Sequence, residues 1–411
     1  MLDVERIRQD FPVLNRKKLI YMDNGATTQK PRAVIDRITE YYTSENSNIH
    51  RSCYLLSILA SEKYDEARRT VAGLIGAADP AEIIFTKGAT ESFNLLSYVM
   101  AEGMLNGRDN VVVTELEHHS NYLTWQHACR LSEAEFRVAR ADGAGRLDLE
   151  DFRQKVDGHT KLVAITMASN VTGQAPPLEE IIQIAKSAGA MVLLDATQAV
   201  QHRKMDVKAL DCDFLAFSGH KAYGPMGTGV LYGKARLLEQ LPPFMYGGDM
   251  VETVGDTENT YKAAPYKWEA GTVNVADILG LEAAVKYLLA SGLDDIKEYE
   301  NSLGAYLLER VKQLDGYRVL GEVKNSTILS FVPEFCSPYD IGVMLAANNI
   351  AIRTGKHCAY PYLRRLGADS TCRLSMAFYN TIGEIDQVVD TLASIRRLAD
   401  KQRIYHDTAA R

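Results

Sequence analysis

Two residues of the sequence, Asp195 and Lys221, have types and positions that suit proton-transfer and carbonyl chemistry. Asp195 closes the apolar run 192–194, and a carboxylate there is either a helix N-cap or a ligand group. Lys221 follows the apolar run 214–217 and lies close to Gly219, which permits close approach of the backbone. Residues that close neighbouring strands of a parallel sheet lie at the same edge, where ligands bind. We therefore expect the two side chains to share one site.

The elements that must position them are short apolar segments that alternate with amphipathic ones. This pattern predicts an α/β fold with a mostly parallel sheet and helices on both faces. The expected strands are Glu82–Thr86, Asn110–Thr114, Lys161–Thr166, Met191–Asp195, Phe214–Ser218 and Gly229–Tyr232. The expected helices include one from about Thr90 to Met100, one that begins near Ser120, and Leu178–Ala188. Five polar clusters follow these strands and are expected on one rim: Thr86–Thr90, Glu117–His119, Ser169–Asn170, Asp195–Gln198 and Ser218–Lys221.

Beyond Gly271 the pattern changes to that of a smaller α+β unit. Its expected helices and strands are Ile278–Ala290, Ile296–Leu314, Ser326–Val332, Tyr339–Asn348, Ala351–Arg353, Arg373–Met376 and Ile382–Leu398. Thr381 and Glu384 have the spacing of a capping box at the start of the last helix. We expect an N-terminal segment (1–20) that packs on the small domain, a large domain (21–290) and a small C-terminal domain (291–411).

The composition excludes several classes of protein. The chain has 411 residues, 46% of them apolar and 24% charged, which is typical of a globular protein. Its net charge of −7 argues against binding to nucleic acid, which requires a basic face. No apolar run is long enough to span a bilayer, and the first residues lack the apolar core of a signal peptide. The six cysteines show no zinc-binding spacing. We expect a cytoplasmic protein with no metal site and no membrane or nucleic-acid partner.

Asp195 and Lys221 together suit pyridoxal 5'-phosphate. This cofactor needs a lysine amine for its Schiff base and a carboxylate that keeps its pyridine nitrogen protonated. Its phosphate needs hydroxyl groups and the backbone N–H groups of a helix N-terminus, which Gly88–Thr90 can provide. A flat side chain should stack on the ring, and His118 is well placed for this.

Eight motifs, in one order along nearly the whole chain, resemble those of cysteine desulfurases of the SufS-type (group II), in the class V aminotransferase family. They are Asp23–Thr28, Glu117–Asn121, Ser169–Gly173, Asp195–Ala199, Asp211–Phe214, Ser218–Lys221, Glu269–Thr272 and Arg353–Ala359. The resemblance implies a fold-type I enzyme that depends on pyridoxal 5'-phosphate. Its large domain would contain a mostly parallel, seven-stranded-type sheet. It implies that L-cysteine is converted to L-alanine and an enzyme-bound persulfide. It further implies a homodimer and a sulfur-acceptor protein of the SufE or SufU type, which serves iron–sulfur cluster assembly.

The resemblance also implies a role for each site residue. Lys221 binds the cofactor and shuttles protons, Asp195 pairs with the pyridine nitrogen, and Cys358 carries the persulfide. The resemblance places His118 on the cofactor ring, with Gln198 and Asn170 around the ring hydroxyl and the substrate. The implied contacts with the phosphate are Ala89, Thr90, Ser218, His220 and the other subunit's Thr272. Arg373, with Arg353 nearby, is implied to bind the substrate carboxylate, which a guanidinium fork suits.

The neighbours of Cys358 independently indicate a reactive thiol. Arg353, Lys356 and His357 lie within five residues of it, and a nucleophilic cysteine needs such an electropositive setting. The interpretation of Cys53 stays open, whereas four cysteines lack clustered basic neighbours or are expected in the core: Cys129, Cys212, Cys336 and Cys372.

Two positions depart from the pattern of the family, and alternative functions remain. Tyr54 stands where the family has a second histidine of its His-Arg-Gly-x-His motif, and Lys356 replaces the first histidine of His-His-Cys. The alternatives are a selenocysteine lyase or another β-eliminating member of the family, and a catalytically silent scaffold, against which the intact Asp195, Lys221 and Cys358 argue. A Rossmann dehydrogenase is disfavoured because Gly224–Gly229 lacks the Gly-x-Gly-x-x-Gly spacing.

Overall fold

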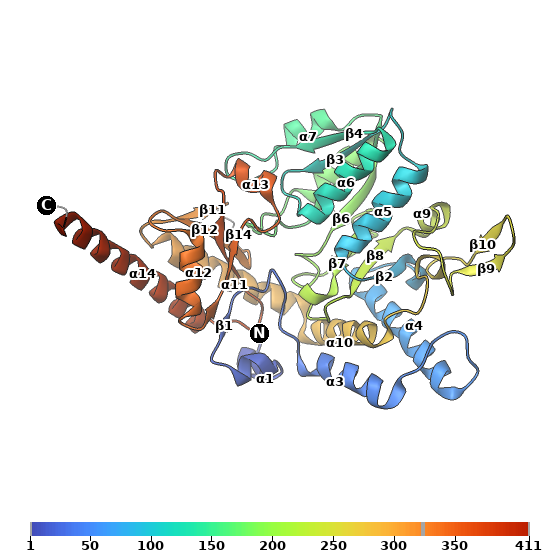
Figure 1. The fold of residues 1–411 in the computed structure, drawn as a ribbon, viewed down its shortest axis with the longest axis horizontal. Helices are drawn as coiled ribbons and strands as arrows, with labels where there is room; N and C mark the ends of the chain where they lie inside the picture. The colour runs from blue at the N-terminus through green and yellow to red at the C-terminus, as the bar shows by residue number, and fades with distance from the viewer. Residues whose placement is uncertain (1, 322–324, 410–411) are drawn as a thin grey trace.

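The computed structural model describes residues 2–321 and 325–409, which form a larger and a smaller lobe side by side (Figure 1). The larger lobe is built on a sheet of strand order β2-β8-β7-β6-β5-β3-β4. Its strands are β2 (Ile83–Thr86), β3 (Asn110–Thr114), β4 (Glu135–Ala139), β5 (Thr160–Thr166), β6 (Met191–Asp195), β7 (Phe214–Ser218) and β8 (Gly229–Gly233). β8 runs antiparallel to both of its neighbours, and the other pairs are parallel. The predicted mostly parallel sheet is therefore confirmed.

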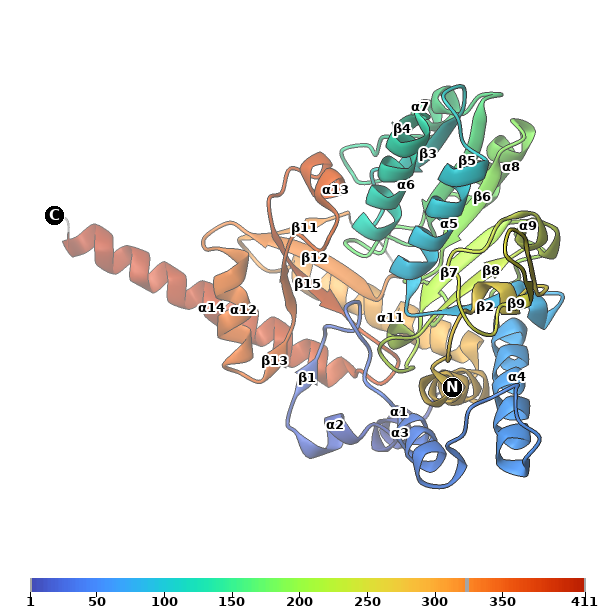
Figure 2. The same cartoon turned by 45° about the vertical axis from the view of Figure 1, so that its right-hand side comes forward.

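The central strands are apolar in their interiors because helices cover both faces of the sheet (Figure 2). Successive side chains of a strand point to opposite faces. Val111 and Val113 accordingly belong to one hydrophobic core, and Val112 belongs to another. The first core contains residues of α5 (Ala89–Gly103), α6 (His119–Ser132) and α9 (Ala235–Gln240). The second contains residues of α4 (Leu55–Ile75), α7 (Leu149–Lys155), α8 (Leu178–Ser187) and α10 (Val275–Ser291), with Val34 from α3 (Arg32–Glu40).

The smaller lobe has an antiparallel sheet of order β11-β12-β15-β14. Its elements are α11 (Leu293–Lys312), β11 (Tyr317–Leu320), β12 (Ile328–Pro333), α12 (Pro338–Ala346), β14 (Arg353–Gly355), α13 (Tyr360–Arg365), β15 (Thr371–Ser375) and α14 (Ile382–Ala409). The predicted capping box opens α14, since Thr381 Oγ1 accepts from the Glu384 N–H (3.2 Å) and Glu384 Oε2 accepts from the Thr381 N–H (3.1 Å). No helix in the described ranges combines the length and apolarity that crossing a bilayer requires.

One predicted strand, Ala351–Arg353, is wrong in its extent. The chain instead forms two short strands, β13 (Ile350–Ala351) and β14, which are interrupted at Ile352. β13 pairs in parallel with β1 (Ile20–Tyr21) from the N-terminal segment, whereas β14 pairs with β15. The interruption is needed because the chain changes partners there, and local sequence carries no signal for a partner more than 300 residues away.

The N-terminal segment lies against both lobes. It contains α1 (Val4–Gln9) and α2 (Pro12–Arg16). The buried Phe11 between them packs its ring against Tyr223 of the larger lobe and Phe378 of the smaller one. Further along, Asn24 donates a hydrogen bond to the Ser375 carbonyl (2.8 Å). The remaining described hairpin, β9 (Val251–Val254) and β10 (Asn259–Tyr261), extends outward from the larger lobe (Figure 1).

Candidate active site

The polar ends of the parallel strands open into a cavity of about 220 Å³, which residues of both lobes line. All five polar clusters that were expected on one rim contribute to its wall. The structure brings together every predicted site residue except Thr272: Ala89, Thr90, His118, Asn170, Asp195, Gln198, Ser218, His220, Lys221, Arg353, Cys358 and Arg373. Thr272 is exposed in the loop before α10, and its implied contact with another subunit stays a prediction.

Asp195 is buried and Lys221 is half-buried in the wall of this cavity. Asp195 Oδ1 accepts a hydrogen bond from the Thr197 N–H (2.9 Å), while burial raises the pKa of the carboxyl. Burial, reinforced by the positive charge of Arg373, lowers the pKa of Lys221 to about 8, and Asp195 acts in the opposite direction. A pKa of about 8 leaves roughly a tenth of the lysine amine neutral at pH 7, far more than for an ordinary lysine, and the neutral amine is the form that reacts with carbonyl groups.

His118 is the N-cap of α6, and its ring is uncharged. Its Nδ1 accepts a hydrogen bond from the Ser120 N–H (3.1 Å), which leaves the proton of the neutral ring on Nε2. Burial and the nearby Lys221 lower the pKa of His118 to about 3. The preceding Glu117 is fully buried and accepts from Asn121 Nδ2 (2.6 Å), and burial raises its pKa to about 8. The histidine thus offers the cavity a neutral, anchored ring.

The N-terminus of α5 forms part of the cavity wall. Gly88 is the N-cap, and Ser218 Oγ accepts from the Ala89 N–H (2.9 Å). The Thr90 and Ser120 hydroxyl groups are 2.7 Å apart. Gly229 on the neighbouring strand must be glycine because a Cβ there would collide with the Gly88 backbone. Hydroxyl groups and free helical N–H groups at one point suit a phosphate.

Arg373 is a buried cation in the wall of the same cavity. Its side chain is only 2% exposed. Its Nη1 donates to the Asn170 carbonyl (2.8 Å) and its Nη2 donates to Asp23 Oδ1 (3.1 Å). Burial lowers the pKa of Arg373, and Asp23 opposes this. Arg353 is half-exposed and lies 3.8 Å from Asp23 Oδ2. The sequence motif had included Asp23, but its partnership with Arg373 was missed, because the two residues lie 350 positions apart.

Cys358 lies at the mouth of the cavity in a strained loop. Its side chain is exposed, and both His357 and Cys358 have positive φ angles (50° and 54°). Such conformations cost roughly 1–3 kcal/mol each for residues other than glycine and gather at functional sites. Two hydrogen bonds hold the loop: Asn170 Nδ2 donates to the His357 carbonyl (2.6 Å), and the His119 N–H donates to the Cys358 carbonyl (2.8 Å).

The other cysteines separate into two groups. Cys129, Cys212 and Cys372 are buried, as expected for core residues, and burial raises the pKa of each thiol, to about 11 for Cys129 and about 12 for Cys212. Burial also raises the pKa of the half-buried Cys336. Cys53 is exposed like Cys358 but is absent from the cavity wall.

Sequence reasoning missed the residues that hold the backbone next to Lys221. The carbonyl oxygen of His220 accepts hydrogen bonds from the Thr28 N–H (3.1 Å), from the Thr27 and Thr28 hydroxyl groups (3.1 Å each) and from Lys30 Nζ (2.7 Å). Burial lowers the pKa of Lys30 to about 7. The Asp23–Thr28 motif was the available signal, but Lys30 lies just outside it.

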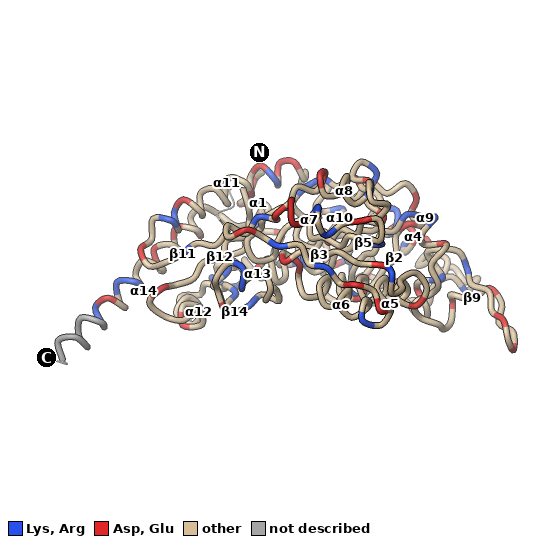
Figure 3. Tube along the Cα trace, turned by 90° about the horizontal axis from the view of Figure 1, so that it is seen from above, with Lys and Arg blue, Asp and Glu red and all other residues tan. Residues whose placement is uncertain are grey.

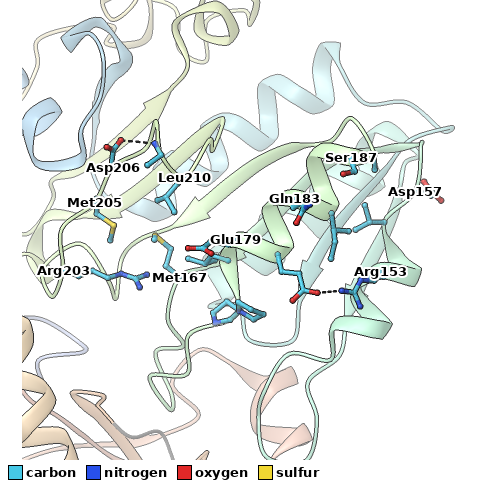
Figure 4. Close-up of a pocket in the computed structure, with 18 of the residues that line it drawn as sticks. Arg153, Asp157, Met167, Glu179, Gln183, Ser187, Arg203, Met205, Asp206 and Leu210 are labelled. Atoms are coloured by element: carbon cyan, nitrogen blue, oxygen red, sulfur yellow. Dashed lines mark hydrogen bonds and ion pairs between the residues drawn. The ribbon is translucent and has the colours of Figure 1, made fainter.

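A larger hollow of about 1360 Å³ lies elsewhere, between α8 and the segment 203–210 (Figure 4). Arg153 and Glu180 form an ion pair on its wall, and Arg203 and Met205 line its other side (Figure 4). It contains none of the predicted site residues. We therefore take the smaller cavity as the candidate active site, because titratable groups with shifted pKa values converge there.

Comparison with known proteins identifies the family. The Aminotransferase class-V family model matches residues 20–388. The chain belongs to that family. It is 42% identical over 401 residues to a cysteine desulfurase of Synechococcus elongatus, covering 96% of this chain but only 64% of the relative. A probable cysteine desulfurase of Streptomyces coelicolor is 41% identical over 408 residues, with 96% of this chain and 98% of the relative covered. The cysteine desulfurase CsdA of Escherichia coli has a similar structure, with a TM-score of 0.91 and 34% identity over 97% of this chain and 99% of that one. The fold is thus that of the fold-type I enzymes.

The cofactor of this family is pyridoxal 5'-phosphate, and the cavity fits it. Several buried polar atoms of the wall have no partner within the described protein: Asn170 Oδ1, Thr197 Oγ1, Gln198 Oε1, His220 Nδ1 and Arg373 Nε. Buried polar atoms are normally hydrogen-bonded, so this cluster is expected to bind a polar ligand. A carboxylate and a lysine at the centre, with hydroxyl and N–H groups at one end, match the ring nitrogen, the aldehyde and the phosphate of the cofactor.

Proposed function

We propose that this chain is a cysteine desulfurase, which converts L-cysteine to L-alanine and keeps the sulfur as a persulfide on Cys358. The observation that carries this proposal is that an exposed thiol and a half-buried lysine amine meet in one cavity, which also contains a buried guanidinium. The names of the relatives support it, since curated proteins more than 40% identical over almost all of this chain are cysteine desulfurases.

Arg373 would bind the α-carboxylate of the substrate. Its two terminal nitrogens are already engaged with Asn170 and Asp23, which fixes the plane of the guanidinium, while Nε stays buried and free. A charge-assisted hydrogen bond from a fixed donor orients the substrate as well as binding it. This contact would direct the substrate side chain toward the mouth of the cavity, where Cys358 lies.

Lys221 would hold the cofactor and move the proton at the substrate Cα. When bound, pyridoxal 5'-phosphate supplies an electron sink for the pair of electrons that this proton leaves behind. Asp195 would hold the proton of the ring nitrogen, and the neutral ring of His118 would stack on the cofactor ring. A lysine amine with a pKa of about 8 is suited to accept and return a proton near neutral pH.

Cys358 would take the sulfur. Its thiolate attacks the substrate sulfur, so that a new S–S bond forms while the C–S bond of the substrate breaks. The electron pair of the broken bond stays on carbon and is protonated, which gives alanine. The strained loop is consistent with a residue that must reach inward to the substrate and later present the persulfide outside.

We also propose that the active form is a homodimer. Apolar side chains are exposed together along the start of α4: Tyr54, Leu55, Leu56, Ile58 and Leu59. Thr272 is exposed as well, as its implied contact with the cofactor phosphate of a second subunit requires. A second copy that covered these residues would remove their apolar surface from water. The persulfide sulfur would then pass to an acceptor protein of the SufE or SufU type for iron–sulfur cluster assembly.

Mass spectrometry of the protein after one turnover with L-cysteine tests the proposed function. A mass increase of one sulfur atom on the peptide that contains Cys358, with one equivalent of alanine released, is expected. Release of pyruvate, ammonia and sulfide, without sulfur on any cysteine, would indicate β-elimination and would contradict the proposal. A persulfide on Cys53 would assign the nucleophile to the other exposed thiol.

A further inference from the structure

A second hollow, of about 510 Å³, lies beside the loop that carries Cys358, between α13, α6 and β4. Four cationic side chains line it, and we call it the basic hollow: Arg140, Lys155, Arg364 and Arg365. Glu115 is the carboxylate in its wall. The excess of positive charge in the basic hollow is opposite in sign to the net charge of the whole chain, which is −7. Lys and Arg positions are visible along α13 and the neighbouring β14 (Figure 3).

The structure uses one of the four cations internally and leaves three for a ligand. Arg365 forms two hydrogen bonds to Glu115 (2.8 and 2.9 Å), which tie α13 to the larger lobe. Among the described residues, the side chains of Arg140, Lys155 and Arg364 form no ion pair. Arg140 and Arg364 are exposed, and Lys155 is half-buried. Three unpaired cations around one hollow attract an anionic surface.

The basic hollow is continuous with the surroundings of the reactive thiol. α13 starts two residues after Cys358 and has six residues, so it is about 9 Å long at ~1.5 Å per residue. The exposed Lys356 and Tyr360 each lie two residues from Cys358 in the chain, and the lysine ammonium is 4.8 Å from the centre of the tyrosine ring. The Tyr360 N–H donates to His119 Nε2 (3.2 Å), which anchors this surface at the start of α6.

We infer that the basic hollow, together with Lys356 and Tyr360, is the docking surface for an acidic sulfur-acceptor protein. The inference rests on the proposed function, because only a persulfide on Cys358 needs an acceptor. A stable protein partner covers roughly 800 Å², so an acceptor whose thiol reaches Cys358 must also cover its neighbours. Carboxylates of the acceptor would pair with Arg140, Lys155 and Arg364, while its own thiol lies against the loop.

The transfer itself needs no further reactant. The acceptor thiolate attacks the outer sulfur of the Cys358 persulfide, and a new S–S bond forms while the S–S bond to Cys358 breaks. Cys358 leaves as the thiolate and takes up the proton that the acceptor thiol has lost. One persulfide and one thiol are exchanged, with no net oxidation.

The test uses the holoenzyme and two synthetic peptides of equal length, each with one cysteine, flanked by glutamate in one and by glutamine in the other. With L-cysteine as the sulfur source, mass spectrometry measures the rate of persulfide formation on each peptide. At low salt the acidic peptide is expected to accept sulfur at least tenfold faster, and this advantage should shrink as salt screens the charges. The double variant R140E/R364E should lose the advantage, while its alanine production with dithiothreitol as acceptor stays within twofold of the native rate.

The matched control is R108E/K208E, which changes the net charge equally at two exposed positions outside the basic hollow. It should keep the preference for the acidic peptide. Equal rates for the two peptides, or a preserved preference in R140E/R364E, would overturn the inference. Loss of the preference in millimolar phosphate, at an ionic strength matched with NaCl, would assign the hollow to a small anion and would also overturn it. Failure of the native enzyme to make alanine with dithiothreitol would instead refute the proposed function.

Discussion

Replacement of Arg373 by lysine tests how the substrate carboxylate is recognised. The change keeps a positive charge in the cavity but removes the planar fork, which now donates to Asn170 and Asp23 and leaves Nε free. A lysine ammonium that keeps the pair with Asp23 cannot also present a fixed donor at the position of Nε. One hydrogen bond to a charged group contributes roughly 1.5–3 kcal/mol. Because 1.4 kcal/mol corresponds to a factor of about ten, kcat/KM for L-cysteine should fall about 10- to 150-fold.

The assay is alanine formation by the holoenzyme at varied L-cysteine concentration, with dithiothreitol as sulfur acceptor. Arg353→Lys is the matched control, since Arg353 is half-exposed and lies 3.8 Å from the same Asp23. Exposed pairs contribute up to about 1 kcal/mol, so this control should lose no more than about fivefold. Both variants must unfold at temperatures close to that of the native protein. A native kcat/KM for Arg373→Lys, or an equal loss in Arg353→Lys, would refute the assigned role of Arg373.

Four further predictions concern the lysine, the thiol, a buried ion pair and the second subunit. The rate at which the apoprotein takes up pyridoxal 5'-phosphate should rise with pH and level off above about 8, because the neutral amine of Lys221 is the reactive form; a pH-independent rate would contradict this. In Cys358→Ser, addition of L-cysteine should still change the absorbance of the bound cofactor, but the rate of alanine formation should fall by several orders of magnitude, because a hydroxyl cannot carry the sulfur. Alanine formation at the native rate would exclude Cys358 as the nucleophile. Glu269→Ala should lower the free energy of unfolding in urea by about 3–5 kcal/mol. The change leaves the buried Arg68 guanidinium without its two hydrogen bonds to Glu269, of 2.7 and 2.8 Å. A loss below about 1 kcal/mol would show that the ion pair contributes little to stability. Thr272→Ala should weaken cofactor binding in the dimer, and sedimentation of a fully active monomer would remove Thr272 from the site.

The sequence predicted the large sheet well because its strands are buried on both faces. Runs such as 191–195 and 214–218 are apolar without alternation, and their observed limits are those expected from the sequence. β4 was missed because its residues are mostly half-exposed and include charged side chains. The strand expected at 351–353 was wrong for a different reason. That stretch is divided between β13, which pairs with β1, and β14, which pairs with β15.

Most of the cavity wall was predicted because its residues come from short motifs at strand ends. Asp195, Lys221 and His118 each follow a recognisable apolar run, and parallel strands bring their ends to one edge. The cationic neighbours of Cys358, Arg353 and Lys356, likewise lie close to it in the chain, whereas burial lowers the pKa of His357 to about 3 and leaves it uncharged. Residues that act through distant contacts, such as Asp23 on Arg373 and Lys30 on the carbonyl of His220, could not be found in this way.

The sequence by itself determined which chemical groups are available and at which ends of the strands they lie, because hydrophobic pattern and turn residues act over a few neighbouring positions. Only the tertiary structure decided how those groups behave. Burial lowers the pKa of Lys221 to about 8 and that of His118 to about 3, because low-dielectric surroundings disfavour the charged forms. Packing of the smaller lobe against the larger one brings Cys358 and Arg373 to the cavity, and it leaves Arg140, Lys155 and Arg364 around the basic hollow without an ion pair among the described residues. These properties depend on distances between residues far apart in the chain, which are set only when the whole chain has folded.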